Sequence, residues 1–249
     1  MRELSAENWK ARLRALTPAR VGLGSTGVSQ RTRDLLDFQQ AHAMARDAVH
    51  ARLDAAGLAA ELETTAKLRV VRVHSRAADR ATYLQRPDLG RTLDEASRTE
   101  LRALRGEYDL AVVVADGLSA LAVERNAAAV VRALLPRLDG WRLAPMCVAE
   151  QGRVAIGDEI SEALGAAMAV VLIGERPGLS SPDSLGAYIT WAPQAGRTDA
   201  ERNCISNIRA EGLRAEAAAA LLGRYLAEAR RRKLTGVALR LDTPMLEDR

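Results

Sequence analysis

Three polar segments of this sequence follow predicted strands, at the positions where a parallel sheet binds its ligands. Asp116-Gly117 ends one apolar run, Glu175-Arg176 ends a second, and residues 199–208 form a polar loop that contains Cys204. Two interpretations stay open for each of the first two segments. The first segment is either a turn that caps the next helix or a ligand contact, and the second is either a structural turn or a ligand site. A lone cysteine is usually an apolar filler, and no nearby histidine supports a nucleophilic Cys204.

A glycine-rich motif lies near the start of the chain, where residues 22–27 match the pattern G-x-G-x-x-G. The dinucleotide-binding form of this motif requires a strand before it and a helix that opens within it. Here a charged, helix-like segment with Pro18 precedes the glycines, so we reject the dinucleotide interpretation. The simpler interpretation is a loop that needs glycine and leads into a helix, with backbone amides that remain available to a polar ligand group.

Metal ligands are sparse, since the chain has two cysteines and three histidines without metal-site spacing. We therefore expect no metal site. His42 falls on a helical stripe of apolar residues, which predicts a partly buried side chain. The sequence also shows no triad and no P-loop, so we expect no catalytic residue in this chain. Any chemistry must then come from a cofactor or a partner.

The apolar pattern predicts the elements that position these segments. Residues 110–115 and 168–173 are continuous apolar runs, typical of parallel strands covered on both faces. Further strands are predicted at 68–74, 141–148, 187–191 and 237–241, and helices at 32–59, 91–104, 118–135, 158–166 and 213–231. This alternation predicts an α/β fold with a mainly parallel, Rossmann-like sheet flanked by helices, and a helical N-terminal segment. We divide the chain into that segment, residues 1–60, and an α/β domain, residues 61–249.

Composition narrows the class of protein. With 48% hydrophobic and 27% charged residues, the chain resembles an ordinary globular protein. No apolar run reaches the roughly 18 residues of a membrane span, and residues 1–20 lack the apolar block of a secretory signal, so we expect a cytoplasmic protein without membrane contact. The net charge of +4 would suit nucleic acid, but the charges are scattered and the basic run at 230–233 ends a predicted helix. We therefore expect no nucleic-acid partner.

Six stretches, in chain order, carry a resemblance to a known family. They are residues 20–27, 32–49, 83–91, 114–119, 174–179 (Gly-Glu-Arg-Pro-Gly-Leu) and 203–208 (Asn-Cys-Ile-Ser-Asn-Ile). Each stretch is weak alone, but together, with similar spacing over residues 20–240, they resemble the small subunit of ethanolamine ammonia-lyase. Relatives tend to carry arginines around the glycine-rich loop, where this chain has Ser25 and Ser29.

The resemblance implies an adenosylcobalamin-dependent lyase that converts ethanolamine to acetaldehyde and ammonia by a radical mechanism. It implies a hetero-oligomer in which the large subunit binds ethanolamine and the small subunit contacts the coenzyme at their interface. By motif matching, the coenzyme contacts fall on Val154, Glu175 and Cys204. The family is compatible with a cytoplasmic location, bacterial microcompartments included. From the residues alone, the alternative is a non-catalytic α/β module that binds a nucleotide or another phosphorylated ligand.

Overall fold

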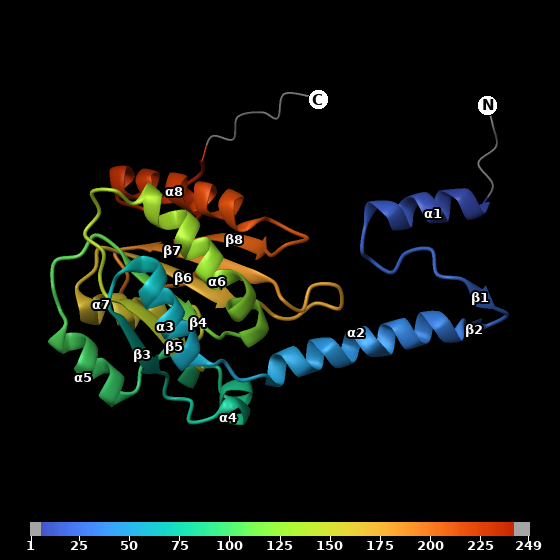
Figure 1. Ribbon diagram of the computed structural model, residues 1–249, viewed down its shortest axis with the longest axis horizontal. Helices are drawn as coiled ribbons and strands as arrows, with labels where there is room; N and C mark the ends of the chain where they lie inside the picture. Colours follow the sequence, from blue (N-terminus) through green and yellow to red (C-terminus); the bar gives the residue numbers. More distant parts are fainter. Residues whose placement is uncertain (1–5, 242–249) are drawn as a thin grey trace.

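A six-stranded sheet organises the chain in the computed structural model, which describes residues 6–241. The strand order is β3-β5-β4-β6-β7-β8, in which the first four strands run parallel and β7 is antiparallel to both its neighbours (Figure 1). The strands are β3 (Val70–His74), β4 (Ala111–Ala115), β5 (Met146–Glu150), β6 (Met168–Gly174), β7 (Leu185–Trp191) and β8 (Arg202–Ile208). The predicted α/β class and mainly parallel sheet are therefore confirmed.

Helices cover both faces of this sheet, which explains why every residue of β4 and β6 is buried. One face carries α3 (Ala55–Ala66), α6 (Ala120–Leu134) and α8 (Ala215–Arg232). The opposite face carries α5 (Glu95–Ala103) and α7 (Ile156–Leu164). Each face has its own apolar core, so the sheet edge between the two cores is rigid.

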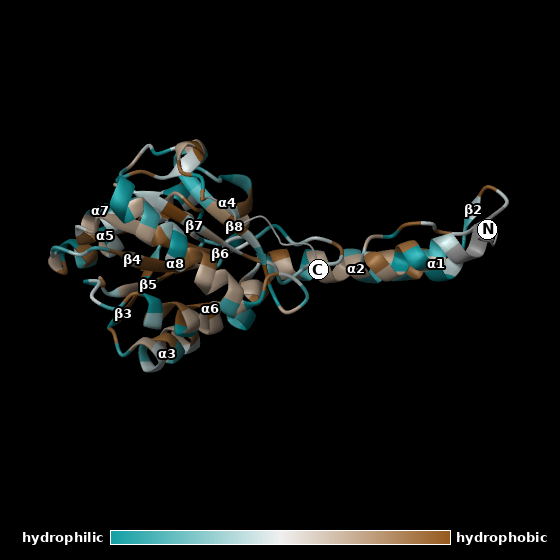
Figure 2. Ribbon diagram, turned by 90° about the horizontal axis from the view of Figure 1, so that it is seen from above, coloured by the Kyte–Doolittle hydropathy of each residue, from teal (hydrophilic) through white to brown (hydrophobic). Residues whose placement is uncertain are grey.

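The N-terminal segment extends away from this body (Figures 1 and 2). It contains α1 (Ala6–Leu16), a small hairpin of β1 (Ser25–Thr26) and β2 (Ser29–Gln30), and the long helix α2 (Thr32–His50). The glycine-rich loop thus leads into a helix as predicted, with Gly22 and Gly27 both at a φ of +62°. The division of the chain at residue 60 stays a prediction.

Two details of this segment differ from the sequence prediction. The helix expected at 32–59 ends at His50, and α3 starts anew because the Asp54 side chain accepts a hydrogen bond from the Gly57 amide. His42 is exposed rather than partly buried, because α2 projects from the body of the chain. Its ring instead stacks on Phe38, with 6.2 Å between the centroids.

The C-terminal part also differs. Residues 199–208, expected as a loop, form the 3-10 helix η3 (Asp199–Glu201) and the edge strand β8. The strand expected at 237–241 is wrong: the 3-10 helix η4 (Gly236–Ala238) lies there. The reason is that the Asn203 side-chain amide donates to the carbonyls of Gly236 and Leu239, at 3.1 and 3.0 Å, in place of a strand ladder. The remaining short helices are α4 (Arg80–Gln85), η1 (Leu89–Arg91) and η2 (Leu135–Arg137).

Neither a membrane-spanning helix nor a metal-binding cluster occurs between residues 6 and 241. None of the helices there combines the length and apolar character needed to cross a membrane. In the same range, no cluster of His, Cys, Asp or Glu side chains is suited to holding a metal ion.

Candidate functional site

The strand order creates a crevice at the carboxyl edge of the sheet. The chain passes from β4 to β5 on one side and then crosses over β4 to reach β6, so the loops after β4 and β5 diverge toward opposite faces. A hollow of about 420 Å³ opens there, which we call the edge hollow. It is lined by strand ends and loops: Tyr83, Gly117, Leu118, Arg153, Val154, Ile173, Gly174, Glu175, Arg176 and Tyr188.

Asp116, at the end of β4, is buried and fastens the two diverging loops together. Its carboxylate accepts hydrogen bonds from the backbone amides of Gln151 (3.0 Å) and Gly152 (2.9 Å) in the loop after β5. The Arg80 guanidinium lies 3.5 Å from the same carboxylate. Burial raises the pKa of Asp116 to about 6, and the Arg80 charge opposes that rise. Asp116 therefore supports the site and is not itself part of the hollow's lining.

Arg80 joins this network to the N-terminal segment. Its Nε donates to the Val49 carbonyl near the end of α2 (2.7 Å), and its Nη1 donates to the Gly117 carbonyl (2.8 Å). The remaining nitrogen, Nη2, is buried and has no hydrogen-bond partner within the described part of the chain. The position of the loop after β4 is thus tied to the root of the projecting helix.

The glycines of the two strand-end motifs allow the walls of the hollow to touch. Gly117 has a φ of +58°, and a Cβ at this position would lie 2.2 Å from the Gly174 carbonyl oxygen. A Cβ at Gly174 would lie 2.1 Å from the Ser119 carbonyl oxygen. Both contacts are too short for any side chain, so only glycine permits this approach of the β4 and β6 ends.

Tyr83 lies under two stacked arginines. The guanidinium carbons of Arg80 and Arg153 are 4.7 and 4.3 Å from its ring centroid. Its hydroxyl donates a hydrogen bond to the Gly152 carbonyl at 3.2 Å, and burial raises the pKa of this phenol. The ring therefore holds Arg153 at the rim of the edge hollow.

Glu175 follows β6 and contacts the neighbouring segments through one carboxylate oxygen. Oε2 accepts hydrogen bonds from the Ser184 hydroxyl (2.5 Å) and from the Asn207 backbone amide (3.2 Å). No described residue donates a hydrogen bond to Oε1. Because the side chain is half-buried and lines the hollow, this second oxygen is free to accept a hydrogen bond from a ligand amide.

Cys204 is exposed on β8, where it pairs with Tyr188 of β7. Burial raises the pKa of Tyr188, and the neighbouring groups Cys204 and Glu175 raise it further, so the phenol stays neutral. Tyr188 lines the edge hollow, which places Cys204 immediately beside it. The thiol Sγ lies 3.3 Å from the Ser206 hydroxyl and has no histidine partner among the described contacts.

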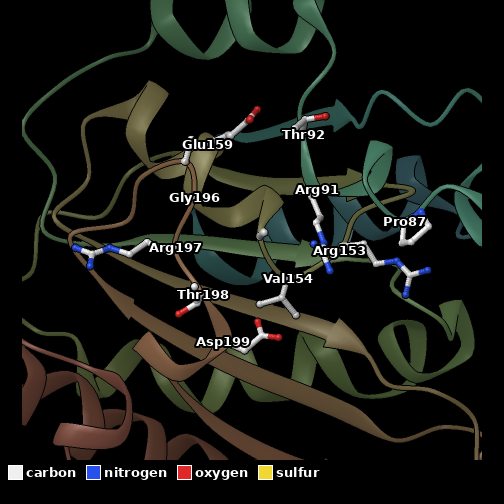
Figure 3. Close-up of a pocket in the computed structure, with 12 residues that line it drawn as sticks. Pro87, Arg91, Thr92, Arg153, Val154, Glu159, Gly196, Arg197, Thr198 and Asp199 are labelled. Carbon is white, nitrogen blue, oxygen red and sulfur yellow. The ribbon is translucent and has the colours of Figure 1, made fainter.

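Val154 leads into α7 and borders two hollows. The second hollow, of about 630 Å³, we call the side hollow (Figure 3). It shares Arg153 and Val154 with the edge hollow and is otherwise lined by Pro87, Arg91, Thr92, Ala155, Glu159 and residues 195–199. The two hollows thus form a continuous concave surface past the carboxyl edge of the sheet.

The structure places two predicted contact residues, Val154 and Glu175, on the edge hollow, and the third, Cys204, on the adjoining strand. Sequence reasoning missed three lining residues: Tyr83, Arg153 and Tyr188. A signal existed for the first, which opens the matched stretch 83–91, and for the second, which directly precedes Val154. No signal in the sequence marked Tyr188 as a lining residue, because an aromatic residue in a strand is more often part of a core.

The sequence matches the family "Ethanolamine ammonia-lyase light chain (EutC)" over residues 6–240. It is 57% identical over 244 residues to the ethanolamine ammonia-lyase small subunit of Xanthomonas campestris pv. campestris, covering 95% of this chain and 89% of that protein. The small subunit of Pseudomonas aeruginosa is 56% identical, with 96% and 89% covered. That of Ralstonia nicotianae is 55% identical, with 96% and 91% covered.

The chain therefore belongs to the ethanolamine ammonia-lyase light chain family. The match covers α1 through η4, so both the projecting segment and the α/β body are family features. The resemblance found in the six sequence stretches is confirmed.

Proposed function

We propose that this chain is the small subunit of an adenosylcobalamin-dependent ethanolamine ammonia-lyase and binds part of the coenzyme in the edge hollow, at its interface with the large subunit. The observation that carries the proposal is the convergence of Val154 and Glu175 on one hollow, with Cys204 directly beside it. The relatives are named as small subunits of this lyase, which supports a large-subunit partner.

The residues of the hollow fit such a ligand. A corrin ring is a broad, largely apolar surface edged with amide side chains. The hollow offers an apolar wall, which includes Leu118, Val154 and Ile173, and the unpaired oxygen Oε1 of Glu175 as an acceptor for an amide N–H. The exposed, small side chain of Cys204 permits close approach on the β8 side.

When bound, the coenzyme supplies the radical chemistry by which ethanolamine becomes acetaldehyde and ammonia. The contribution of this chain is binding and orientation. Glu175 accepts a hydrogen bond, the apolar wall excludes water, and the Asp116–Arg80 network keeps the loops in place. We assign ethanolamine binding and the groups that act on it to the large subunit, because no paired acid, base or nucleophile lines the hollow in the described chain.

The experiment is reconstitution with the cognate large subunit. A coloured coenzyme complex should form only when both subunits are present, and it should turn over ethanolamine. Coenzyme binding and turnover by the large subunit alone, at the same affinity and rate, would refute the proposal. An isolated chain that binds nucleotides but never associates with the large subunit would favour a phosphorylated-ligand module instead.

A further inference from the structure

The side hollow is lined by two arginines, Arg91 and Arg153, that form no ion pair with an acidic residue between positions 6 and 241. Three other charged residues line it, and each already has a partner. Glu159 accepts from Arg98 (3.0 Å) and from the Leu93 amide (2.8 Å). Arg197 pairs with Glu201, and Asp199 lies 3.6 Å from Arg202 Nε.

Arg91 and Arg153 differ from these residues. Neither side chain has an acidic partner among residues 6–241, although both line the hollow. In Figure 3 both extend from the same end of the hollow, whereas the side chain of Arg197 points away from them. Two unpaired guanidinium groups on one concave surface repel each other and attract an anion.

Arg153 is also held in place before any ligand arrives. Its guanidinium stacks on Tyr83, its Nη2 donates to the Tyr83 carbonyl (3.4 Å), and its backbone amide donates to the Gly90 carbonyl (2.7 Å). Its Nε is buried and lacks a hydrogen-bond partner in the described chain. An arginine fixed in this way loses little conformational entropy on binding, which favours bidentate recognition of a phosphate.

We propose that Arg91 and Arg153 form an anion subsite that takes the phosphate group of the coenzyme's nucleotide tail. This inference rests on the proposed function, because it assumes that the corrin occupies the edge hollow. The hollows share Arg153 and Val154, so a ligand in the first that extends past Val154 reaches the two arginines. The corrin amides are neutral, whereas the phosphodiester carries a negative charge, and it is the group that unpaired arginines would select.

The test compares two ligands that differ only in the phosphate. Cobinamide phosphate and cobinamide are titrated into the reconstituted complex of both subunits, and the ratio of their affinities is measured by equilibrium binding. The chain is wild type, Arg91→Gln or Arg153→Gln, with Arg72→Gln as the control. Arg72 is exposed on β3 outside both hollows, so its replacement removes the same charge elsewhere.

Wild type and the Arg72→Gln control should prefer the phosphate form by about tenfold, as expected for charge-assisted hydrogen bonds. Each hollow variant should bring the ratio close to one, and the preference should weaken with salt. Because a ratio is measured, a general loss of binding in one variant cancels. An unchanged ratio in both hollow variants overturns the subsite but leaves the proposed function intact. Failure of the wild-type complex to bind adenosylcobalamin in the same assay overturns the proposed function itself.

Discussion

The contact between Arg80 and Asp116 should make the stability of the chain depend on pH in a specific way. Both side chains are almost fully buried, at 7% and 4% exposed, and lie 3.5 Å apart. Burial raises the pKa of Asp116 from an ordinary value of 3.8 to about 6, despite the opposing Arg80 charge. Removing Arg80, as in Arg80→Met, should therefore raise this pKa further.

The direction in which stability changes with pH follows from the protons bound by the folded and unfolded chains. Between pH 3.8 and about 6 the folded chain holds the Asp116 proton that the unfolded chain has lost, so stability falls as pH rises. In the wild type this loss amounts to about 3 kcal/mol and ends near pH 6. In the Arg80→Met variant the free energy of unfolding should keep falling above pH 6, by up to about 1.4 kcal/mol for each pH unit.

The assay is urea unfolding of the full chain at about pH 5 and about pH 8. Near pH 5 the substitution costs mainly the hydrogen bonds to Val49 and Gly117. Near pH 8 the total cost should approach about 3–5 kcal/mol, because a buried carboxylate is left unpaired. The double variant Arg80→Met/Asp116→Asn is the control and should lose the extra pH dependence. A cost of Arg80→Met that is equal at both pH values, or a pH dependence retained in the double variant, would show that Arg80 does not hold down the pKa of Asp116.

Three further predictions concern single residues. Asp158 holds the buried Arg202 guanidinium at 2.6 and 2.8 Å, and Asp158→Ala would leave it only one acidic partner, the exposed Asp199 at 3.6 Å. The substitution should lower the free energy of unfolding by about 3–5 kcal/mol, and a loss below ~1 kcal/mol in urea unfolding would contradict this. Gly117→Ala should lower the free energy of unfolding by at least ~2 kcal/mol more than Gly140→Ala, because both glycines have positive φ but only a Cβ at Gly117 would meet backbone atoms. Equal midpoints of the two variants in thermal unfolding would argue against the close approach of the β4 and β6 ends. A maleimide should label exposed Cys204 in the isolated folded chain but not Cys147, because burial raises the pKa of the Cys147 thiol to about 12. Mass spectrometry of the labelled peptides measures the two reactions, and equal labelling would count against the buried position of Cys147.

Sequence patterns predicted most of the sheet because β4 and β6 are covered on both faces and therefore read as unbroken apolar runs. The edge strand β8 escaped prediction because one face is open: Ile205 and Ile208 are buried, while Cys204, Ser206 and Asn207 are exposed and give the segment the polarity of a loop. Strand 237–241 was predicted from apolar residues alone, although Val237 is 75% exposed.

The candidate site was predicted in part for a related reason. Strand-end positions can be identified from the sequence, so Glu175 and the loop after β4 were expected near a ligand. The partners of a side chain cannot be identified from the sequence, because Asp116 and Arg80 meet only after the crossover brings α4 against β4. For the same reason the stacking of Arg153 on Tyr83 cannot be predicted from the spacing of the two residues in the sequence.

We propose that Glu175 and Cys204 face the coenzyme, and the coenzyme affinity of the reconstituted complex tests this placement. Glu175→Gln keeps an oxygen for Ser184 and Asn207 but puts an N–H₂ donor in place of Oε1. Adenosylcobalamin should then bind at least about tenfold more weakly, as it should to Cys204→Trp. Glu61→Gln, an equal charge loss on the exposed side of α3, should leave affinity unchanged. Wild-type affinity in both site variants would contradict the account.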